Sequence, residues 1–235
     1  MSTNERVASH YTADDVLDRI DANLAQNGVD PQHPTLEDLA PFDNFHSRGL
    51  GATLDVIAMA DFPAGARILD VGGGLSGPAR VLASRAKVHV TVLELTPSFV
   101  ETGRILTERV GMSDQVDFDL GDGTKMPYAD ASFDGVWTQH STMNIDDKEA
   151  LYSEIHRVLK PGGRLAMHEV MKGPTEGVDY PLPWSSSPEN SFLRSPEAVR
   201  ALIEGVGFRA PIWEDESEKV IAFAAPLPGA SPSDR

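Results

Sequence analysis

Short runs of apolar residues alternate with amphipathic stretches from residue 67 onward, and this alternation is the first indication of the fold. The apolar runs predict strands over residues 67–71, 88–95, 116–120, 133–139 and 163–170. Helical spacing of the positions between them predicts helices that begin near Ser76, Thr96 and Asp146. Strands that alternate with helices are typical of a parallel sheet built from βαβ units. The region therefore predicts an α/β fold.

The pattern before this region is helical and less regular. Residues 1–10 suggest no regular structure, whereas apolar positions at helical spacing predict helices over residues 11–28 and 50–62. The connector between these two helices, residues 29–49, is expected to be irregular with one short helix.

The pattern after the last of these strands changes again. Residues 172–192 form a loop rich in Pro and Ser, which is either a lid or a plain surface loop. A helix is predicted from residue 195 to residue 207. Residues 208–227 then predict two antiparallel strands joined by a tight acidic turn.

Composition and charge exclude several classes of function. The chain carries 20 Lys and Arg against 36 Asp and Glu, a net charge of −16, which repels nucleic acid and anionic membrane surfaces. It has no cysteine, so disulfides, thiolate nucleophiles and cysteine-based zinc sites are excluded. The N-terminus has no signal-peptide pattern, and no apolar run reaches the length of a membrane helix. We therefore expect a cytoplasmic protein.

Gly72, Gly74 and Gly77 form the pattern G-x-G-x-x-G directly after the first predicted strand. This pattern usually indicates a dinucleotide whose phosphates bind at a helix N-terminus. Asp70, however, adds a carboxylate that would repel a phosphate and attract an ammonium group. Glu94 ends the second strand and suits the ribose hydroxyls of either ligand. The loop by itself leaves both a pyrophosphate and an amino-acid group open.

A resemblance becomes specific when the motifs are taken in order. "LDVGGGLSGPAR", the acid in "VLEL", "GDGTKMPYADASFDGVW" and "LKPGGRLAMHE" follow one another at spacings that resemble a class I S-adenosylmethionine-dependent methyltransferase. The resemblance implies a Rossmann-like, doubly wound sheet of seven strands in the order 3-2-1-4-5-7-6, with strand 7 antiparallel. It also implies three parts of the chain: an N-terminal helical cover segment (1–60), a cofactor-binding domain (61–226) and a disordered tail (227–235).

The same resemblance implies how S-adenosylmethionine is bound. Its amino-acid part is expected beside Asp70, Gly72 and Gly74, its ribose at Glu94, its adenine at Leu95, Asp122 and Gly123, and its methionine part at Gln139. For Asp122 and Gly123, a simple acidic turn is the alternative interpretation.

A closer resemblance adds candidates outside these motifs. "NFHSRGLGAT" and "TQHSTMNIDDKEALYSEIHRVLKPGG" resemble the sarcosine/dimethylglycine and phosphoethanolamine N-methyltransferase branch. In that branch the segment before the first strand covers the cofactor, which implies this role for Phe45, His46 and Arg48. N-terminal tyrosines cover the active site in the same branch, so Tyr11 is a candidate for substrate binding.

Four residues at the ends of the fourth and fifth strands are candidates for catalysis. His140 is suited to act as a general base, although it is equally well explained as a structural histidine. Asn144 is placed to orient a nucleophile, and His168 or Glu169 to bind a substrate ammonium or accept a proton. Tyr180 and Trp184 are candidates to cover the substrate, because aromatic faces attract ammonium groups. No close carboxylate pair has ligand spacing, so no metal is expected.

The sequence thus predicts methyl transfer to a small molecule, with an amine nitrogen as the first choice of acceptor. Methylation of oxygen or carbon on a natural-product scaffold is the alternative within the fold. An NAD-dependent oxidoreductase and a cofactor-binding protein without chemistry are the alternatives outside it. The oligomeric state is not readable from the sequence.

Overall fold

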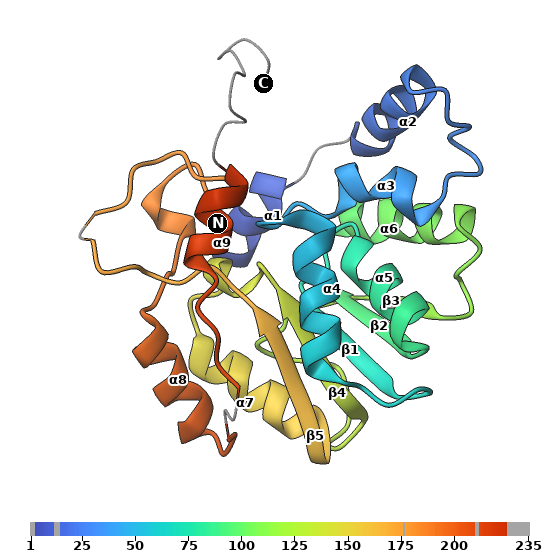
Figure 1. The fold of residues 1–235 in the computed structure, drawn as a ribbon. Coiled ribbons are helices and arrows are strands. Elements are labelled where there is room, and N and C mark those ends of the chain that lie inside the picture. Colours follow the sequence, from blue (N-terminus) through green and yellow to red (C-terminus); the bar gives the residue numbers. More distant parts are fainter. Residues whose placement is uncertain (1–2, 12–14, 176, 210–211, 225–235) are drawn as a thin grey trace.

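The computed structural model describes residues 3–11, 15–175, 177–209 and 212–224 (Figure 1). Within this part of the chain, the centre is a parallel sheet of five strands in the order β3-β2-β1-β4-β5. The strands are β1 (Arg67–Val71), β2 (His89–Glu94), β3 (Val116–Leu120), β4 (Phe133–Gln139) and β5 (Leu159–His168). Because neighbouring strands are parallel, their carboxyl ends meet at one edge of the sheet, where α/β folds bind their ligands.

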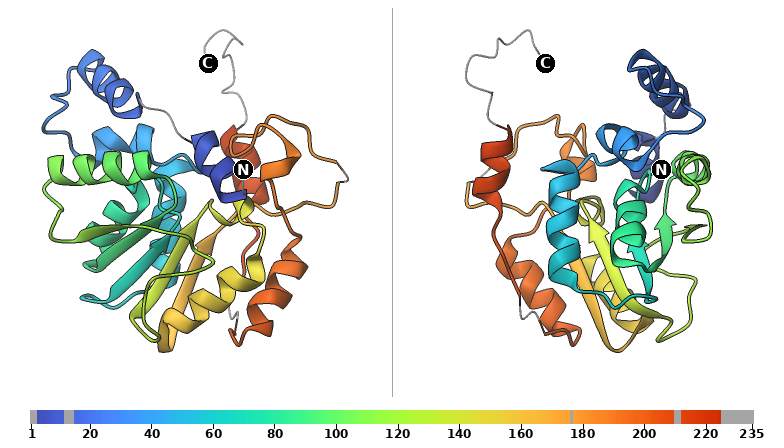
Figure 2. Two further views of the ribbon diagram at one scale, coloured as in Figure 1. Left: turned by 180° about the vertical axis from the view of Figure 1, so that it is seen from behind. Right: turned by 45° about the vertical axis from the view of Figure 1, so that its right-hand side comes forward.

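Helices cover both faces of the sheet, as the views in Figure 2 show. On one face lie α4 (Gly49–Ala60), α5 (Gly77–Ala86) and α6 (Pro97–Arg109); on the other lie α7 (Lys148–Val158) and α8 (Pro196–Gly205). Successive strand residues point to opposite faces, so Ile68 packs with the first group of helices and Leu69 with the second. The predicted helix starts are confirmed, since Ser76, Thr96 and Asp147 are the N-cap residues of α5, α6 and α7.

The N-terminal segment packs over the carboxyl edge of the sheet and beside α6. It contains α1 (Thr3–Tyr11), α2 (Val16–Gln26) and α3 (Leu36–Asp43). Ile20 and Leu24 of α2 pack with Leu39 of α3 and Leu106 of α6. The prediction that residues 1–10 lack regular structure was wrong, because residues 3–11 form α1 and its Val7 is buried.

The predicted strands over residues 208–227 were also wrong where the structure describes them. Residues 217–224 form α9 (Ser217–Ala224), and the described sheet has five strands instead of seven. Asp215 Oδ1 accepts a hydrogen bond from Ser217 N, and Val220 N donates to Glu216 O, so an Asx-type turn starts a helix. A short apolar run such as residues 220–224 does not by itself distinguish a strand from a helix. The tail predicted for residues 227–235 lies outside the described residues.

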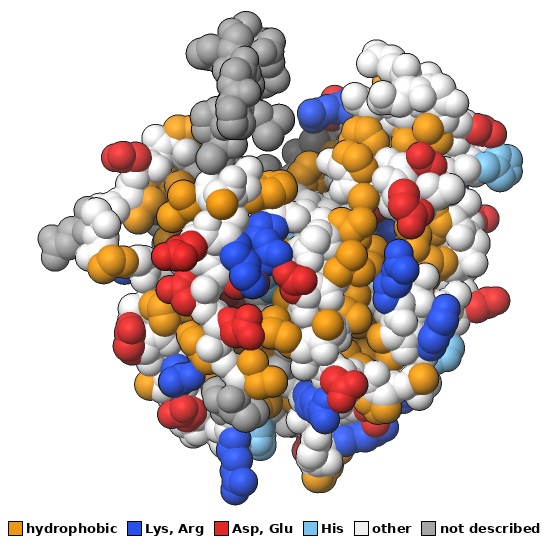
Figure 3. Space-filling view, in the orientation of Figure 1, with side chains coloured by type: hydrophobic (Ala, Val, Ile, Leu, Met, Phe, Trp, Pro, Cys, Tyr) orange, Lys and Arg blue, Asp and Glu red, His pale blue; other side chains and the backbone are white. Residues whose placement is uncertain are grey.

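No described helix combines the length and the apolar character that crossing a membrane requires. Figure 3 shows acidic and basic side chains interspersed over one face of the molecule. The excess of acidic residues is therefore spread among basic ones on this face.

Candidate functional site

The glycine loop is held against the end of β4 by close contact. Gly72 has a φ of +74°, and a Cβ added to it would lie 2.5 Å from the Cβ of Ser141. Gly72 N donates to Leu93 O at 2.8 Å, and Ser141 Oγ donates to Val71 O at 2.9 Å. Only glycine fits this position, because any side chain would collide with Ser141 and strain the backbone.

Asp70 lies under this loop with an unsatisfied carboxylate. Its side chain is buried, and Oδ2 has no hydrogen-bond partner among the described residues. Burial, together with smaller contributions from the negative charges of Glu94 and Glu169, raises the pKa of Asp70 to about 8. A buried carboxylate in this condition gains most from a cationic partner, and an ammonium group is such a partner.

Glu94, at the end of β2, connects the loop to the start of α6. One carboxylate oxygen accepts from Gly74 N at 2.9 Å and the other from Thr96 N at 2.8 Å. A carboxylate has about four acceptor positions, so two remain for hydroxyl groups of a ligand. Leu95, the next residue, is half-buried beside it.

Asp122 and Gly123 follow β3 and are in contact with the N-terminal segment. Asp122 Oδ1 accepts from the backbone and the hydroxyl of Thr124, both at 2.8 Å, and Oδ2 accepts from Asn4 Nδ2 at 2.7 Å. A Cβ on Gly123 would lie 2.9 Å from a methyl carbon of Val71, so this turn packs directly on the end of β1. The predicted adenine residues therefore lie at the same edge as the glycine loop and under α1.

At the N-terminal end of α5, where a dinucleotide would place its phosphates, the space is occupied by another residue of the protein, Asp43. A Cβ on Gly77 would lie within 2.5 Å of both the carboxylate carbon and the backbone oxygen of Asp43. The Asp43 carboxylate forms a buried ion pair with Arg80, with 2.7 Å between Oδ2 and the guanidinium. The third glycine of the pattern thus makes room for Asp43. Sequence reasoning missed this residue, and the only signal was Arg80, an arginine among the small and apolar residues in the first half of α5.

Three histidines lie close together on the other side of the loop. The ring centroids of His140 and His168 are 5.0 Å apart, and His46 lies 5.8 Å and 6.3 Å from them. His46 Nε2 contacts Gly49 O at 2.9 Å and Thr53 Oγ1 at 3.0 Å. Within the described residues, no group of three His, Asp or Glu side chains is arranged to hold a metal ion.

Gln139 connects the three histidines to α4. Its Oε1 accepts from Thr53 Oγ1 at 3.3 Å, and its Nε2 lies 3.5 Å from Nδ1 of His168. Nε2 of His168 lies 3.5 Å from a carboxylate oxygen of Glu216. Gln139 is therefore part of a polar chain that extends from α4 to the start of α9.

His140 differs from the other two histidines in having no partner for its ring. The backbone of His140 has a φ of +51°, and its N–H donates to His168 O at 2.9 Å. Its imidazole ring makes no hydrogen bond with any described residue. Burial lowers the pKa of His140 to about 3, with smaller contributions from His168 and His46. The ring is therefore neutral at physiological pH and has a lone pair available to accept a proton or a hydrogen bond.

Asn144 is already fully engaged by the protein. Its Oδ1 accepts from the hydroxyl of Tyr11 at 2.9 Å, and its Nδ2 donates to Trp184 O at 3.0 Å and Asn190 O at 2.9 Å. Burial raises the pKa of Tyr11, and the charge of Glu94 adds to the rise. Asn144 thus connects α1 to residues 180–192. Tyr180 and Trp184, the two predicted substrate-covering residues of that segment, are both half-buried.

The carboxylate of Glu169 is also occupied by hydrogen bonds from the protein. It accepts from Thr138 Oγ1 at 2.9 Å, from Thr142 N at 3.1 Å and from Ser141 N at 3.4 Å. Burial raises its pKa, while these hydrogen bonds oppose the rise. All its donors belong to the end of β4 and the turn that follows.

The other two predicted cover residues are Phe45 and Arg48. Phe45 is 77% exposed. Arg48 forms ion pairs with Asp55 and Glu216, so it joins α4 to the residues before α9.

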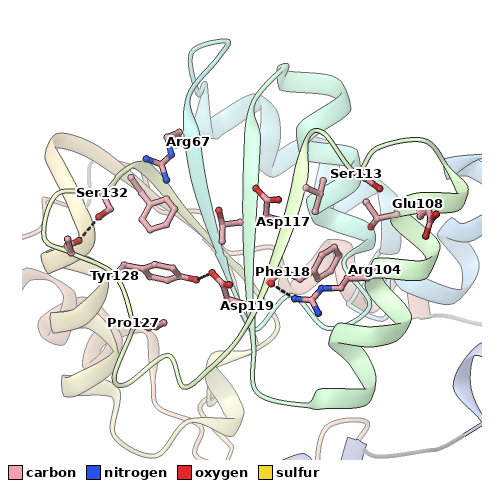
Figure 4. Close-up of a pocket in the computed structure, with 15 residues that line it drawn as sticks. Arg67, Arg104, Glu108, Ser113, Asp117, Phe118, Asp119, Pro127, Tyr128 and Ser132 are labelled. Carbon is pink, nitrogen blue, oxygen red and sulfur yellow. Dashed lines mark hydrogen bonds between the residues drawn. The ribbon is translucent and has the colours of Figure 1, made fainter.

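A separate hollow of about 730 Å³ opens on the outer face of β2 and β3 (Figure 4). The connection from β3 to β4 contains no helix in the described chain, so that face is left open to solvent. Its lining includes Arg67, Arg104, Asp117, Asp119 and Tyr128. In Figure 4, the Tyr128 hydroxyl points toward Asp119, to which it donates at 2.9 Å. None of the predicted site residues lines this hollow.

Fold and site together define a class of protein that binds a nucleoside ligand at the carboxyl edge of a parallel sheet. Residues 69–167 match a family described as a methyltransferase domain, so this part of the chain is similar to methyltransferases.

The individual matches cover only part of longer proteins. The chain is 43% identical over 105 residues to a sterol 24-C-methyltransferase of Gibberella zeae, which covers 45% of this chain and 28% of that protein. It is 27% identical over 172 residues to phosphoethanolamine N-methyltransferase 3 of Arabidopsis thaliana, over 73% of this chain and 34% of that protein. The crystal structure of a 4+2 cyclase, SpnF, matches with a TM-score of 0.66 and 29% identity, over 77% of this chain and 66% of that one. The chain thus spans about a third of each of these two curated relatives.

Proposed function

We propose that the protein transfers the methyl group of S-adenosylmethionine to a small molecule. The observation that carries the proposal is the buried Asp70 carboxylate beside the glycine loop, whose Oδ2 has no hydrogen-bond partner in the described part of the chain. An ammonium group such as that of S-adenosylmethionine would satisfy it, and a pyrophosphate would not. Asp43 supports the same conclusion, because it fills the end of α5 that a dinucleotide's phosphates need. These observations disfavour an NAD-dependent oxidoreductase.

When bound, S-adenosylmethionine supplies a methyl group that is activated by a positively charged sulfur. The cofactor residues of this proposal are Asp70, Gly72 and Gly74 for the amino-acid part, Glu94 for the ribose, Leu95, Asp122 and Gly123 for the adenine, and Gln139 for the methionine part. Glu94 has acceptor positions left for the ribose hydroxyls, and Asp70 Oδ2, which has no partner among the described residues, is an acceptor for the ammonium group.

His140 is the residue that we propose accepts a proton from the methyl acceptor. Its ring is neutral, lies at the carboxyl edge of the sheet and makes no hydrogen bond with a described residue. Asn144 and Glu169, in contrast, have their polar atoms engaged by the protein, so we assign them positioning roles. His168 has its own contacts with Gln139 and Glu216.

This arrangement favours a hydroxyl compound as the acceptor over an amine. A hydroxyl group must lose its proton as the oxygen attacks, and the ring of His140 offers a neutral, unpaired nitrogen for that proton, although its pKa of about 3 makes it a weaker base than an ordinary histidine. An ammonium-bearing acceptor would favour a free carboxylate near His140. Glu216, the acid beside the cluster, is already paired with Arg48 and Lys219. The amine nitrogen that the resemblance implies therefore remains the second candidate.

We extend the proposal to the organisation of the chain. Residues 1–60 act as the cover segment and residues 61–226 as the cofactor-binding domain, with the ring centroid of the cover residue His46 5.8 Å from that of His140. A small molecule is the expected acceptor, because the net charge of −16 opposes a nucleic-acid partner.

The first test is calorimetric titration with S-adenosylhomocysteine and, separately, with NAD⁺. We expect binding of the first alone, and strongly weakened binding in Glu94→Ala. Binding of NAD⁺ without S-adenosylhomocysteine would overturn the proposal.

Binding does not prove methyl transfer, since SpnF has a similar fold and is a cyclase. The second test therefore follows radiolabelled methyl groups from S-adenosylmethionine into pairs of phenols and anilines that share one scaffold. His140→Asn is expected to lower transfer to a phenol by about 10²–10⁴-fold, the usual contribution of a general base, with cofactor affinity unchanged. Labelled aniline products formed equally well by His140→Asn would support the amine candidate instead.

A further inference from the structure

Lys148 is a buried cation that neither the sequence analysis nor the proposed reaction uses. It lies at the start of α7 and is only 2% exposed. Its Nζ donates to Thr142 O at 2.5 Å and to Ile145 O at 2.8 Å. Both carbonyl groups belong to the turn that follows β4. A charged group with so little access to water is costly, so it needs a compensating role in the structure.

Glu169 holds the same turn from the other end. Its carboxylate accepts from the backbone N of Ser141 and of Thr142, and the side chain is half-buried. Thr142 is therefore bound at its N–H by an anion and at its C=O by a cation. The carboxylate at the N–H of Thr142 and the ammonium at its C=O therefore stabilise the same orientation of the Thr142 backbone.

This turn touches both halves of the crevice. At one end, Ser141 packs against Gly72 and donates to Val71 O, so it contacts the glycine loop. At the other end, Asn144 accepts from Tyr11 and donates to Trp184 O. Figure 2 shows α1 beside the orange segment that carries Trp184, at the same end of the sheet.

We propose that Lys148 and Glu169 are a pair of positioning residues which, through the backbone of Thr142, hold Asn144 and thereby fix α1 and the 184–192 segment over the crevice. Neither side chain contacts the cofactor or the acceptor in this proposal. Their effect passes from the turn to Asn144, and from Asn144 to Tyr11 and Trp184. The inference rests on the proposed function only in treating the crevice as the site of catalysis.

Hydrogen exchange of the protein without any ligand tests this proposal independently of methyl transfer. In Lys148→Met, exchange in residues 3–11 and 184–192 is expected to rise on the order of tenfold or more, as for the loss of a buried charged donor. Exchange in β1 and α5 is expected to stay as in the wild type. Lys160→Met is the matched control, because Lys160 pairs with Asp134 near the surface on β5.

A double-mutant cycle separates positioning from a general loss of stability. Asn144→Leu cuts the connection between the turn and α1, so adding Lys148→Met to it is expected to cause no further rise of exchange in α1. Lys148→Arg, which restores a cation, is expected to recover protection in part. Glu169→Gln keeps an acceptor oxygen and serves as the milder variant if Lys148→Met does not fold.

Two results would overturn the proposal. One is unchanged exchange of α1 in folded Lys148→Met and Glu169→Gln. The other is an additive effect of Lys148→Met and Asn144→Leu. Failure of the proposed function would look different, since it would be a wild-type protein that does not bind S-adenosylhomocysteine but still shows these exchange effects.

Discussion

Asp43 and Arg80 form a buried ion pair that joins the segment before the first strand to the helix after the glycine loop. The distance between Asp43 Oδ2 and the guanidinium is 2.7 Å, and the two side chains are 3% and 0% exposed. Arg80 also donates to Leu75 O, Gly103 O and the hydroxyl of Thr107. One guanidinium thus holds α3, α5 and α6 around the loop.

Removing either partner leaves the other buried charge without its counter-ion. Asp43→Asn and Arg80→Met are each expected to lower the free energy of unfolding by about 3–5 kcal/mol, measured by urea denaturation. Arg85→Met is the control, because Arg85 lies 3.9 Å from Glu37 at the exposed surface and its pair contributes about 0–1 kcal/mol. An equal loss in Arg85→Met would contradict the special role of the buried pair.

The contact between Gly72 and Ser141 predicts a specific coupling between two substitutions. Gly72→Ala is expected to destabilise the protein, because its Cβ would lie 2.5 Å from Ser141 Cβ at a φ of +74°. Ser141→Gly removes the obstacle but not the backbone strain. The double variant is therefore expected to be more stable than the sum of the single effects, by about 0.5–3 kcal/mol in thermal unfolding. Additive effects would show that the loop does not approach Ser141 this closely.

The strands and the glycine loop were predictable from the sequence because their signals are local. Residues 67–71, 116–120 and 133–139 were predicted with the bounds that the structure has. Each of these strands is a short apolar run between turn residues, so neighbouring positions alone reveal it. Asp70 and Glu94 follow from their places at strand ends.

The rest could not be predicted because it depends on distant contacts. Asp43 is an ordinary acid in a connector until Arg80 and Gly77 are placed beside it. Asn144 looks like a catalytic residue until Tyr11 occupies its oxygen. The segment 217–224 is apolar enough for a strand, and only its acidic start favours the helix.

The raised pKa of Asp70 predicts how stability depends on pH. Its pKa is about 8 in the folded protein against 3.8 as the ordinary value, so the folded state holds a proton that the unfolded state releases between these values. The contribution of Asp70 to stability therefore falls as pH rises from about 4 to about 8. Asp70→Asn removes this contribution, so the variant is expected to gain stability relative to the wild type over that range. A difference in unfolding free energy that does not change with pH would contradict this.

The same carboxylate predicts a pH dependence of cofactor binding. An ammonium group beside Asp70 favours its ionised form, so the affinity for S-adenosylhomocysteine is expected to rise from pH 6.5 to pH 8.5, by up to about tenfold per pH unit. Binding is also expected to release a proton, which calorimetry in buffers of different ionisation enthalpy detects. Asp70→Asn is expected to bind more weakly and without this pH dependence. Proton release of the same size in Asp70→Asn would assign the titration to another group.

Tyr11 and Asn144 predict how the cover segment is held closed. Tyr11→Phe removes the hydroxyl that donates to Asn144 Oδ1 at 2.9 Å and leaves that buried oxygen without its donor. The cost of an unsatisfied buried acceptor is about 1–3 kcal/mol, so amide exchange in residues 3–11 is expected to rise by about 5–150-fold. Tyr128→Phe is the matched control, because its hydroxyl donates to Asp119 in the hollow on the other side of the sheet. If both variants raised exchange in α1 equally, or neither did, the Tyr11 hydroxyl would not be what holds the cover. Faster exchange in Tyr11→Phe alone, together with weaker retention of S-adenosylhomocysteine, would show that the Tyr11 hydroxyl helps to hold α1 over the crevice.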